Sequence, residues 1–163
     1  MKPDQRNHRP QNTYHDRADQ LVSAIAIAEK IINESPSIDE VTKKHFIDFG
    51  QQIKEMALHP KPQFKNIASI KHLENDFLTY WNESSGEDVE MFWRLITQHE
   101  ISFERKDILK KVLLQKRIKN NGEYDHVISG ISIAEQTGRI SNDEAIKLNQ
   151  YLSAFEKRRD AQL

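Results

Sequence analysis

The sequence of 163 residues contains no cysteine and only five glycines and five prolines. Without cysteine the chain cannot form disulfides, thiolate zinc sites or cysteine nucleophiles. The small number of glycines and prolines argues against collagen-like and low-complexity sequences. A chain of this length can bury a hydrophobic core without disulfides or a metal.

The chain also has little net charge, −1, because it contains 24 Lys and Arg and 25 Asp and Glu. Binding to nucleic acid or anionic lipid would therefore need a local patch of charge. The most apolar stretch, Leu21–Ile32, is interrupted by Ser23, Glu29 and Lys30, and it is shorter than the ~20 apolar residues of a membrane span. Residues 1–12 are polar and have no apolar core of a signal peptide. We expect a flexible tail over 1–12, no membrane association and a cytoplasmic protein.

Apolar residues recur every three or four positions along the chain, which predicts helices and no sheet. Seven helices are expected, joined by short turns. They cover about 14–33, 37 to the His59-Pro60 pair, about 65–82, a short segment after Gly86, about 103–119, a segment between Gly122 and Gly138, and a last one from Ser141. The pattern predicts a single all-α domain over residues 13–163, in a bundle-like or irregular array.

Two Ser-x-x-Glu sequences, at 37–40 and 141–144, predict capping boxes at helix starts. In the helix after the first of them, Gly50 predicts a close contact with another helix. The residues of that helix expected to face the core are Val41, Phe46, Phe49, Ile53 and Met56. Those expected in the helix that precedes Gly138 are Tyr124, Val127, Ile128, Ile131 and Ala134.

Residues 23–29 match residues 129–135 at five of seven positions, and each segment leads through a turn into one of the two capping boxes. This similarity is consistent with a pseudo-repeat of the two terminal helical hairpins. Apolar helices resemble one another easily, so independent hairpins of similar sequence are the alternative.

Few motifs point to catalysis. The chain has no Gly-x-Ser-x-Gly and no glycine-rich phosphate loop. Helical di-iron sites need two Glu-x-x-His motifs, whereas this chain has one, Glu123–His126, which stands at a helix start where an acid suits the helix dipole. The His15-Asp16 pair also lacks the further ligands of a metal-dependent phosphohydrolase. We expect no enzyme, no metal and no cofactor, and keep a metal-dependent enzyme as the third hypothesis.

A basic segment spans residues 105–119, with seven basic residues and one acid. Residues 133–149 resemble the helix-turn-helix of bacterial regulators in Ala134, Gly138 and the Ile140-Ser141 turn. They depart from it because the following helix begins with acids, and a glycine-capped helix followed by a capping box explains the same residues. The nucleic-acid-binding candidates are Arg105, Lys106, Lys110, Lys111, Lys116, Arg117, Lys119 and Arg139.

An acidic segment lies between His72 and Trp93, with six acids and no Lys or Arg. It could present a surface to a basic partner such as a nuclease-type toxin, because complementary charges speed and select association. The alternatives are that it neutralises the basic segment or is simply solvated. Tyr80 is expected to be more exposed than Trp81. The protein-interaction candidates are Glu74, Asp76, Tyr80, Glu83, Glu87, Asp88 and Glu90.

The leading hypothesis is a non-catalytic helical protein that binds another protein in an adaptor or immunity-like role. The alternative is a nucleic-acid-binding regulator that uses helix 105–119 and segment 133–149. A homo-oligomer is also open, because the apolar helix at Leu21–Ile32 could be buried within the chain or across a two-fold axis.

Overall fold

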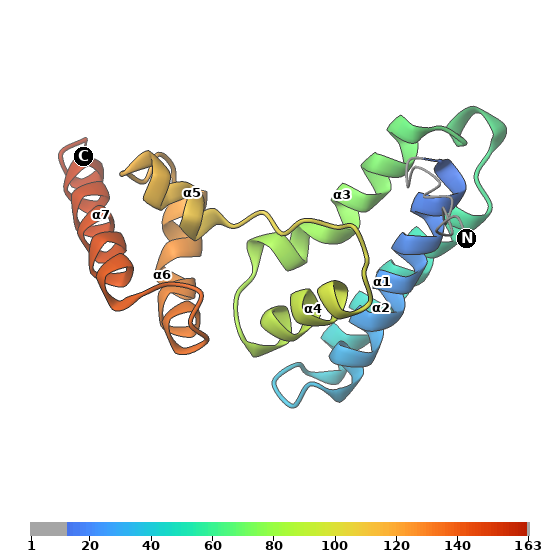
Figure 1. Ribbon diagram of the computed structural model, residues 1–163, viewed down its shortest axis with the longest axis horizontal. Helices are drawn as coiled ribbons and strands as arrows, with labels where there is room; N and C mark the ends of the chain where they lie inside the picture. The colour runs from blue at the N-terminus through green and yellow to red at the C-terminus, as the bar shows by residue number, and fades with distance from the viewer. Residues whose placement is uncertain (1–12, 163) are drawn as a thin grey trace, which may run out of the picture. The chain divides into compact units, whose positions relative to one another are not determined.

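The computed structural model describes residues 13–162, which form seven α-helices and a short 3-10 helix, with no strand (Figure 1). The elements are α1 (Tyr14–Glu34), α2 (Glu40–Leu58), η1 (Pro62–Phe64), α3 (Ile67–Glu83), α4 (Glu87–Gln98), α5 (Ile108–Gln115), α6 (Asn121–Gln136) and α7 (Asn142–Asp160). The predicted all-α class is confirmed. None of these helices has the length and apolar character needed to cross a membrane. The tail predicted for 1–12 lies outside the described residues.

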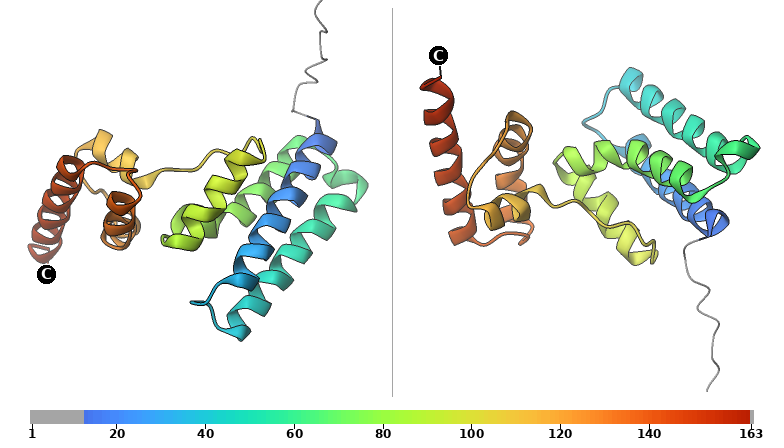
Figure 2. Two further views of the ribbon diagram at one scale, coloured as in Figure 1. Left: turned by 60° about the horizontal axis from the view of Figure 1, so that its bottom comes forward. Right: turned by 90° about the horizontal axis from the view of Figure 1, so that it is seen from above.

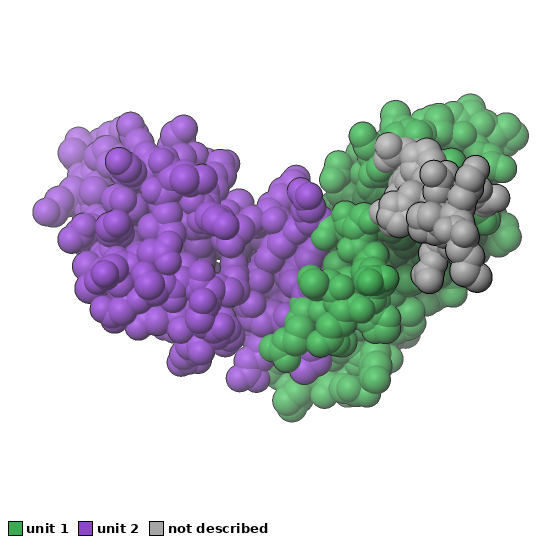
Figure 3. Space-filling model, in the orientation of Figure 1, with its two compact units in different colours: residues 1–79, 94–103 green, residues 80–93, 104–163 purple. Residues whose placement is uncertain are grey.

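The chain forms two compact units, shown in different colours in Figure 3. Unit 1 comprises the chain up to Thr79 together with Arg94–Phe103, and unit 2 comprises Tyr80–Trp93 and the chain from Glu104 onward. Two of the three boundaries fall within α3 and α4, and the third lies in the connection between α4 and α5. The extent of the predicted domain, residues 13–163, and the pseudo-repeat of terminal hairpins stay predictions.

In unit 1, α1 packs along α2 (Figure 2). The predicted apolar stripe of α1 is confirmed, and its buried residues are Ala18, Leu21, Ala24, Ile25, Ala28, Ile31 and Ile32. Gly50 of α2 is buried, and a Cβ atom added to it would lie 3.3 Å from Cγ2 of Ile25. The close helix–helix contact predicted at Gly50 is therefore present.

A Gly50→Val substitution should lower the free energy of unfolding by about 1–3 kcal/mol, the usual cost of overpacking a close contact. The branched side chain would extend beyond a Cβ position that is already tight against Ile25. Chemical denaturation of the variant measures the change. Gln52→Val is the control, because Gln52 is exposed on the same helix and gives the effect of valine on helix propensity alone. Equal stability of the two variants would contradict the prediction.

The capping box predicted at 37–40 is wrong, because α2 begins later in the chain. Asp39 caps the helix, and its carboxylate accepts hydrogen bonds of 2.8 Å from both the backbone N–H and the hydroxyl of Thr42. The Oγ atom of Ser37 instead lies 3.1 Å from Oγ of Ser35. Of the two possible N-cap residues, Ser37 and Asp39, the structure uses Asp39.

Of the five residues of α2 predicted to face the core, only Ile53 is confirmed as buried. Only Gly50, Ile53 and Ala57 of this helix are buried, and they form a narrow stripe. Val41 is 81% exposed and Met56 is 49% exposed. Phe49 is exposed and Phe46 is partly buried. A stripe this narrow leaves large apolar side chains of α2 in contact with solvent.

In unit 2, α5, α6 and α7 pack on one another around a common core. Its buried residues are Leu109, Val112, Ile118, Val127, Ala134, Ile140, Ala145, Leu148 and Leu152. The turn between α6 and α7 is as predicted, because Gly138 adopts a left-handed φ of 75° and Ser141 and Glu144 form a capping box. Ile128 was expected in this core but is 55% exposed.

Candidate functional site

The basic helix predicted over 103–119 is wrong at both ends. The carboxylate of Asp107 accepts a hydrogen bond from the backbone N–H of Lys110 and starts α5 at Ile108. Lys116 adopts a left-handed backbone with φ of 58°, which ends the helix at Gln115. Only Lys110 and Lys111 of the predicted basic residues therefore lie on a helix. Arg105 and Lys106 precede it, and Lys116, Arg117 and Lys119 follow it.

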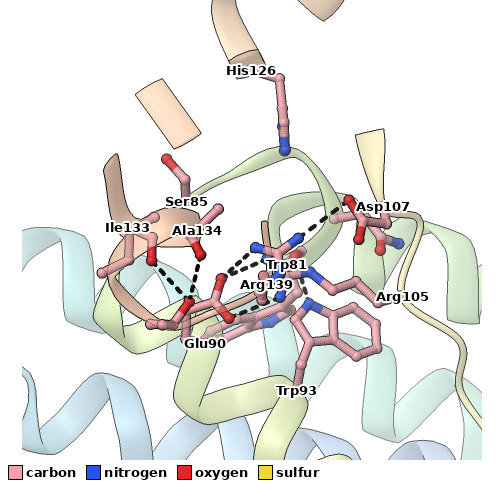
Figure 4. Close-up of polar contacts among 12 residues, drawn as sticks. Trp81, Ser85, Glu90, Trp93, Arg105, Asp107, His126, Ile133, Ala134 and Arg139 are labelled. Carbon is pink, nitrogen blue, oxygen red and sulfur yellow. Dashed lines mark hydrogen bonds and ion pairs between the residues drawn. The ribbon is translucent and has the colours of Figure 1, made fainter. Parts of the chain in front are cut away.

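A buried ion-pair cluster lies at the start of α4 in unit 2 (Figure 4). The carboxylate of Glu90 is 9% exposed and accepts two hydrogen bonds from the guanidinium of Arg105, at 2.9 and 3.1 Å. It also accepts a hydrogen bond of 2.6 Å from Arg139. A second nitrogen of Arg139 lies 3.3 Å from Asp107. We call these four residues the Glu90 cluster.

The two carboxylates and two guanidinium groups of the Glu90 cluster together carry no formal net charge. Burial alone would raise the pKa of Glu90, but the hydrogen bonds and positive charges of Arg105 and Arg139 outweigh burial and hold this pKa below its ordinary value. From the sequence, Glu90 was predicted to belong to an acidic interaction surface, and Arg105 and Arg139 to a nucleic-acid-binding surface. Their pairing supports the alternative interpretation, in which acidic residues neutralise part of the basic segment.

Hydrogen bonds to the backbone extend the Glu90 cluster within unit 2. The side-chain oxygen of Asn82 accepts a 2.8 Å bond from the backbone N–H of Lys106. The indole N–H of Trp93 donates a 2.8 Å bond to the carbonyl of Trp81. Ser85 donates to the carbonyl of Ser129 on α6. The first bond holds residues 104–107 to the end of α3, the second joins α4 to α3, and the third holds α6 to the α3–α4 turn. Together with the ion pairs of the Glu90 cluster, they give this region a structural role.

Glu123 and His126, the one Glu-x-x-His pair, are both buried, and each has a structural partner. Glu123 accepts a 2.8 Å hydrogen bond from the backbone N–H of Lys119, and it lies 3.4 Å from the ammonium of Lys111. Burial would raise its pKa, but these contacts lower it. Glu123 thus has the helix-start role predicted for it. No group of three or more His, Asp or Glu within residues 13–162 is arranged to hold a metal ion.

The imidazole of His126 is buried and is hydrogen-bonded to the backbone. Its Nδ1 lies 2.9 Å from the carbonyl oxygen of Glu83, and since a carbonyl only accepts, Nδ1 carries the proton. Burial lowers the pKa of His126, and the charges of Arg105 and Arg139 lower it further, against the opposing effect of the bond to Glu83.

This lowered pKa predicts a loss of stability in mild acid. The unfolded chain binds a proton at His126 near the ordinary pKa of 6.5, whereas the folded chain binds it only at lower pH. The stability linked to His126 is therefore complete above about pH 6.5 and falls as the pH drops toward the folded pKa. Urea unfolding at several pH values should show a smaller decrease for His126→Gln than for the natural chain. His99→Gln, an exposed control, should keep the full decrease; equal pH profiles of the two variants would contradict the prediction.

The predicted acidic surface is only partly present. Glu74, in unit 1, is buried and its carboxylate accepts hydrogen bonds from Arg17 at 2.6 and 2.9 Å. Glu74 and Glu90 are therefore unavailable to a partner. The other candidates have accessible surface: Asp76, Glu83 and Glu87 are exposed, and Tyr80 and Asp88 are partly buried. Tyr80 is more exposed than Trp81, as expected, and burial together with the charge of Asp88 raises its pKa.

The six remaining basic candidates are all exposed. They are Lys106, Lys110, Lys111, Lys116, Arg117 and Lys119. Arg139, by contrast, forms ion pairs with Glu90 and Asp107. The structure therefore leaves six exposed basic residues on unit 2, whereas both arginines of the Glu90 cluster are held in ion pairs.

Unit 1 contains a groove that the sequence analysis did not predict. It has a volume of about 730 Å³ and lies among the start of α1, the end of α2, η1 and the first half of α3. Its apolar lining comes from Tyr14, Met56, Pro60, Phe64, Ala68 and Leu73. Met56 and Phe64 are 49% and 54% exposed. We call this feature the α1–α3 groove. The sequence feature that could have indicated this groove is Phe64, an aromatic residue within a polar, proline-containing connection.

None of the family models, curated proteins or solved structures compared with this chain matches it. Its function must be inferred from its own residues.

Proposed function

We propose that the protein is a non-catalytic interaction protein that binds a segment of another protein in the α1–α3 groove. The observation that carries this proposal is the exposure of Met56 and Phe64 in the lining of the groove. Covering apolar surface stabilises a complex by about 25 cal/mol per Å² before the costs of association are subtracted. Grooves between helices commonly receive apolar side chains of a partner segment.

The chemistry of the lining favours a peptide over a substrate that undergoes reaction. The only ionisable side chains that line the groove, within the described residues, are those of Tyr14, His59, Lys61 and His72, and no carboxylate is among them. The hydroxyl of Tyr14 donates a 2.8 Å bond to the carbonyl of Ala57 and so fixes the start of α1 against the end of α2. Met56 supplies a flexible, polarisable side chain, a type that adapts to varied partner surfaces.

A random peptide library displayed on phage tests the proposal with the full chain as target. Selected peptides should bind the natural chain and lose most of their affinity for Phe64→Asp, measured by fluorescence anisotropy. Leu114→Asp is the matched control, because Leu114 is 79% exposed and belongs to unit 2. Failure to select any peptide, or selected peptides that bind Phe64→Asp and Leu114→Asp equally well, would overturn the proposal.

Nucleic-acid binding is the second candidate function, favoured by the six exposed basic residues between 106 and 119. Exposed lysine and arginine side chains contact phosphates and release counterions, which makes binding strongly dependent on salt. Two observations place this function second. Arg105 and Arg139 are paired within the Glu90 cluster, and α7 has Asp143 and Glu144 in its first turn.

Titration of labelled duplex DNA at low and moderate salt tests the second candidate. A triple variant, Lys106→Glu, Lys110→Glu and Arg117→Glu, should abolish binding if the basic face is responsible. Lys111 is left intact because it lies beside the buried Glu123. The control changes the same amount of charge at exposed positions elsewhere: Lys30→Glu, Lys147→Glu and Lys157→Glu. No binding by the natural chain at low salt would rule out this function.

A further inference from the structure

The charged side chains that line the α1–α3 groove, and those of residues 56–73 to which most of the lining belongs, are lysines and histidines only. Residues 56–73 contain three lysines and two histidines but no Asp or Glu. His59, Lys61 and His72 line the groove itself. Lys65 and Lys71 are exposed in the same segment. Within the described residues, no ion pair involves any of the three lysines, whereas His72 lies 3.6 Å from Asp76.

We infer that the α1–α3 groove takes an acidic amphipathic segment of a partner protein, whose apolar side chains contact Met56 and Phe64 while its carboxylates face Lys61 and the neighbouring lysines. This inference rests on the proposed function and gives the chemical class of the partner. Opposite charges around an apolar contact raise the association rate and select among partners. The positive charge of Lys61 and of the other lysines in residues 56–73 would disfavour a basic segment by the same physics.

Other occupants fit less well. Residues 1–12 of this chain contain Lys2, Arg6 and Arg9 against the single acid Asp4, and Met1 is their only large apolar residue. Their sequence therefore offers the same sign of charge as Lys61 and few apolar side chains for the groove. A bilayer attracts lysines too, but it is contacted by helices that insert a projecting apolar face. The apolar residues here line a hollow of about 730 Å³. Side chains of a partner segment can enter such a hollow, whereas a flat lipid surface cannot.

The phage library provides the test. Peptides selected on the full chain should be richer in Asp and Glu than the unselected library. Changing the acids of a selected peptide to Asn and Gln should weaken it roughly tenfold, as expected for two or three exposed ion pairs. A Lys61→Gln, Lys65→Gln, Lys71→Gln variant should weaken the acidic peptide to a similar extent. The control triple, Lys30→Gln, Lys110→Gln and Lys147→Gln, should leave its affinity unchanged, because these exposed lysines neither line the groove nor belong to residues 56–73.

The possible outcomes separate this inference from the function on which it rests. Peptides that depend on Phe64 but show neither acid enrichment nor sensitivity to the lysine triple would overturn the inference and leave the groove as a binding site. Peptides that bind Phe64→Asp as tightly as the natural chain would overturn both the inference and the proposed function.

Two further measurements with Phe64→Asp test other occupants of the groove. Sedimentation velocity that shows a dimer lost in Phe64→Asp would identify a second copy as the occupant. Vesicles of phosphatidylcholine and phosphatidylserine that bind the natural chain but not Phe64→Asp would identify a lipid surface. Either result would overturn the inference.

Discussion

Replacing Glu90 with Gln should lower the free energy of unfolding by about 3 kcal/mol, the lower part of the range for breaking a buried ion pair. The carboxylate is 9% exposed and accepts hydrogen bonds from both Arg105 and Arg139. A neutral amide keeps the size of the side chain but leaves the guanidinium of Arg105 without a carboxylate partner and that of Arg139 with Asp107 alone. The two arginine side chains are 16% and 20% exposed, so water compensates part of the loss. Urea unfolding followed by circular dichroism at pH 7 measures the change.

Glu87→Gln is the control for this prediction. Glu87 lies in the first turn of the same helix but is exposed, so its removal should change the free energy of unfolding by less than about 0.5 kcal/mol. A loss below about 1 kcal/mol for Glu90→Gln would contradict the buried-pair interpretation.

The pH dependence provides a second check on Glu90. A carboxyl with a lowered folded pKa contributes stability above its ordinary pKa of 4.5, and this contribution disappears as the pH falls through the folded value. When the pH is lowered from above 4.5 to below it, the free energy of unfolding should therefore decrease more for the natural chain than for Glu90→Gln.

Helices that carry local start and stop signals could be predicted from the sequence. The turn between α6 and α7 is an example, because Gly138 supplies the left-handed residue and Ser141 with Glu144 supplies the capping box. The α5 segment shows the limit. Its apolar periodicity continues on both sides of the helix, so periodicity alone predicted one long helix. Asp107 instead starts α5 through a side-chain cap, and Lys116 ends it through its left-handed backbone conformation.

The candidate sites depend on contacts that local patterns do not contain. Glu90 is 15 residues from Arg105 and 49 from Arg139, so counting charges along the chain assigned them to opposite surfaces. The α1–α3 groove was missed for a related reason. Periodicity tells which residues of α2 share a face, but it cannot tell how much of that face another helix covers. Met56 has the helical spacing of a core residue and is nevertheless half exposed.

Phe92→Ala should lower the free energy of unfolding by about 3–5 kcal/mol, as is usual when a buried aromatic residue is truncated. Phe92 is fully buried in unit 2. Its ring stacks on that of Trp81, with centroids 4.2 Å apart, and meets the ring of Trp93 edge to face at 5.1 Å. The substitution removes both aromatic contacts and leaves a cavity between two tryptophans that the surrounding helices cannot close without moving.

The two tryptophans make this prediction directly observable, because Trp81 and Trp93 are the only ones in the chain and both contact Phe92. Folded Phe92→Ala should show altered tryptophan emission together with its lower unfolding midpoint. Met91→Ala is the matched control, since Met91 is the neighbouring residue and is 44% exposed; it should change the free energy of unfolding by less than about 1 kcal/mol and leave the emission as it is. Similar losses in the two variants would mean that the ring of Phe92 does not fill the space between the tryptophans, and the stacking with Trp81 would then have to be rejected.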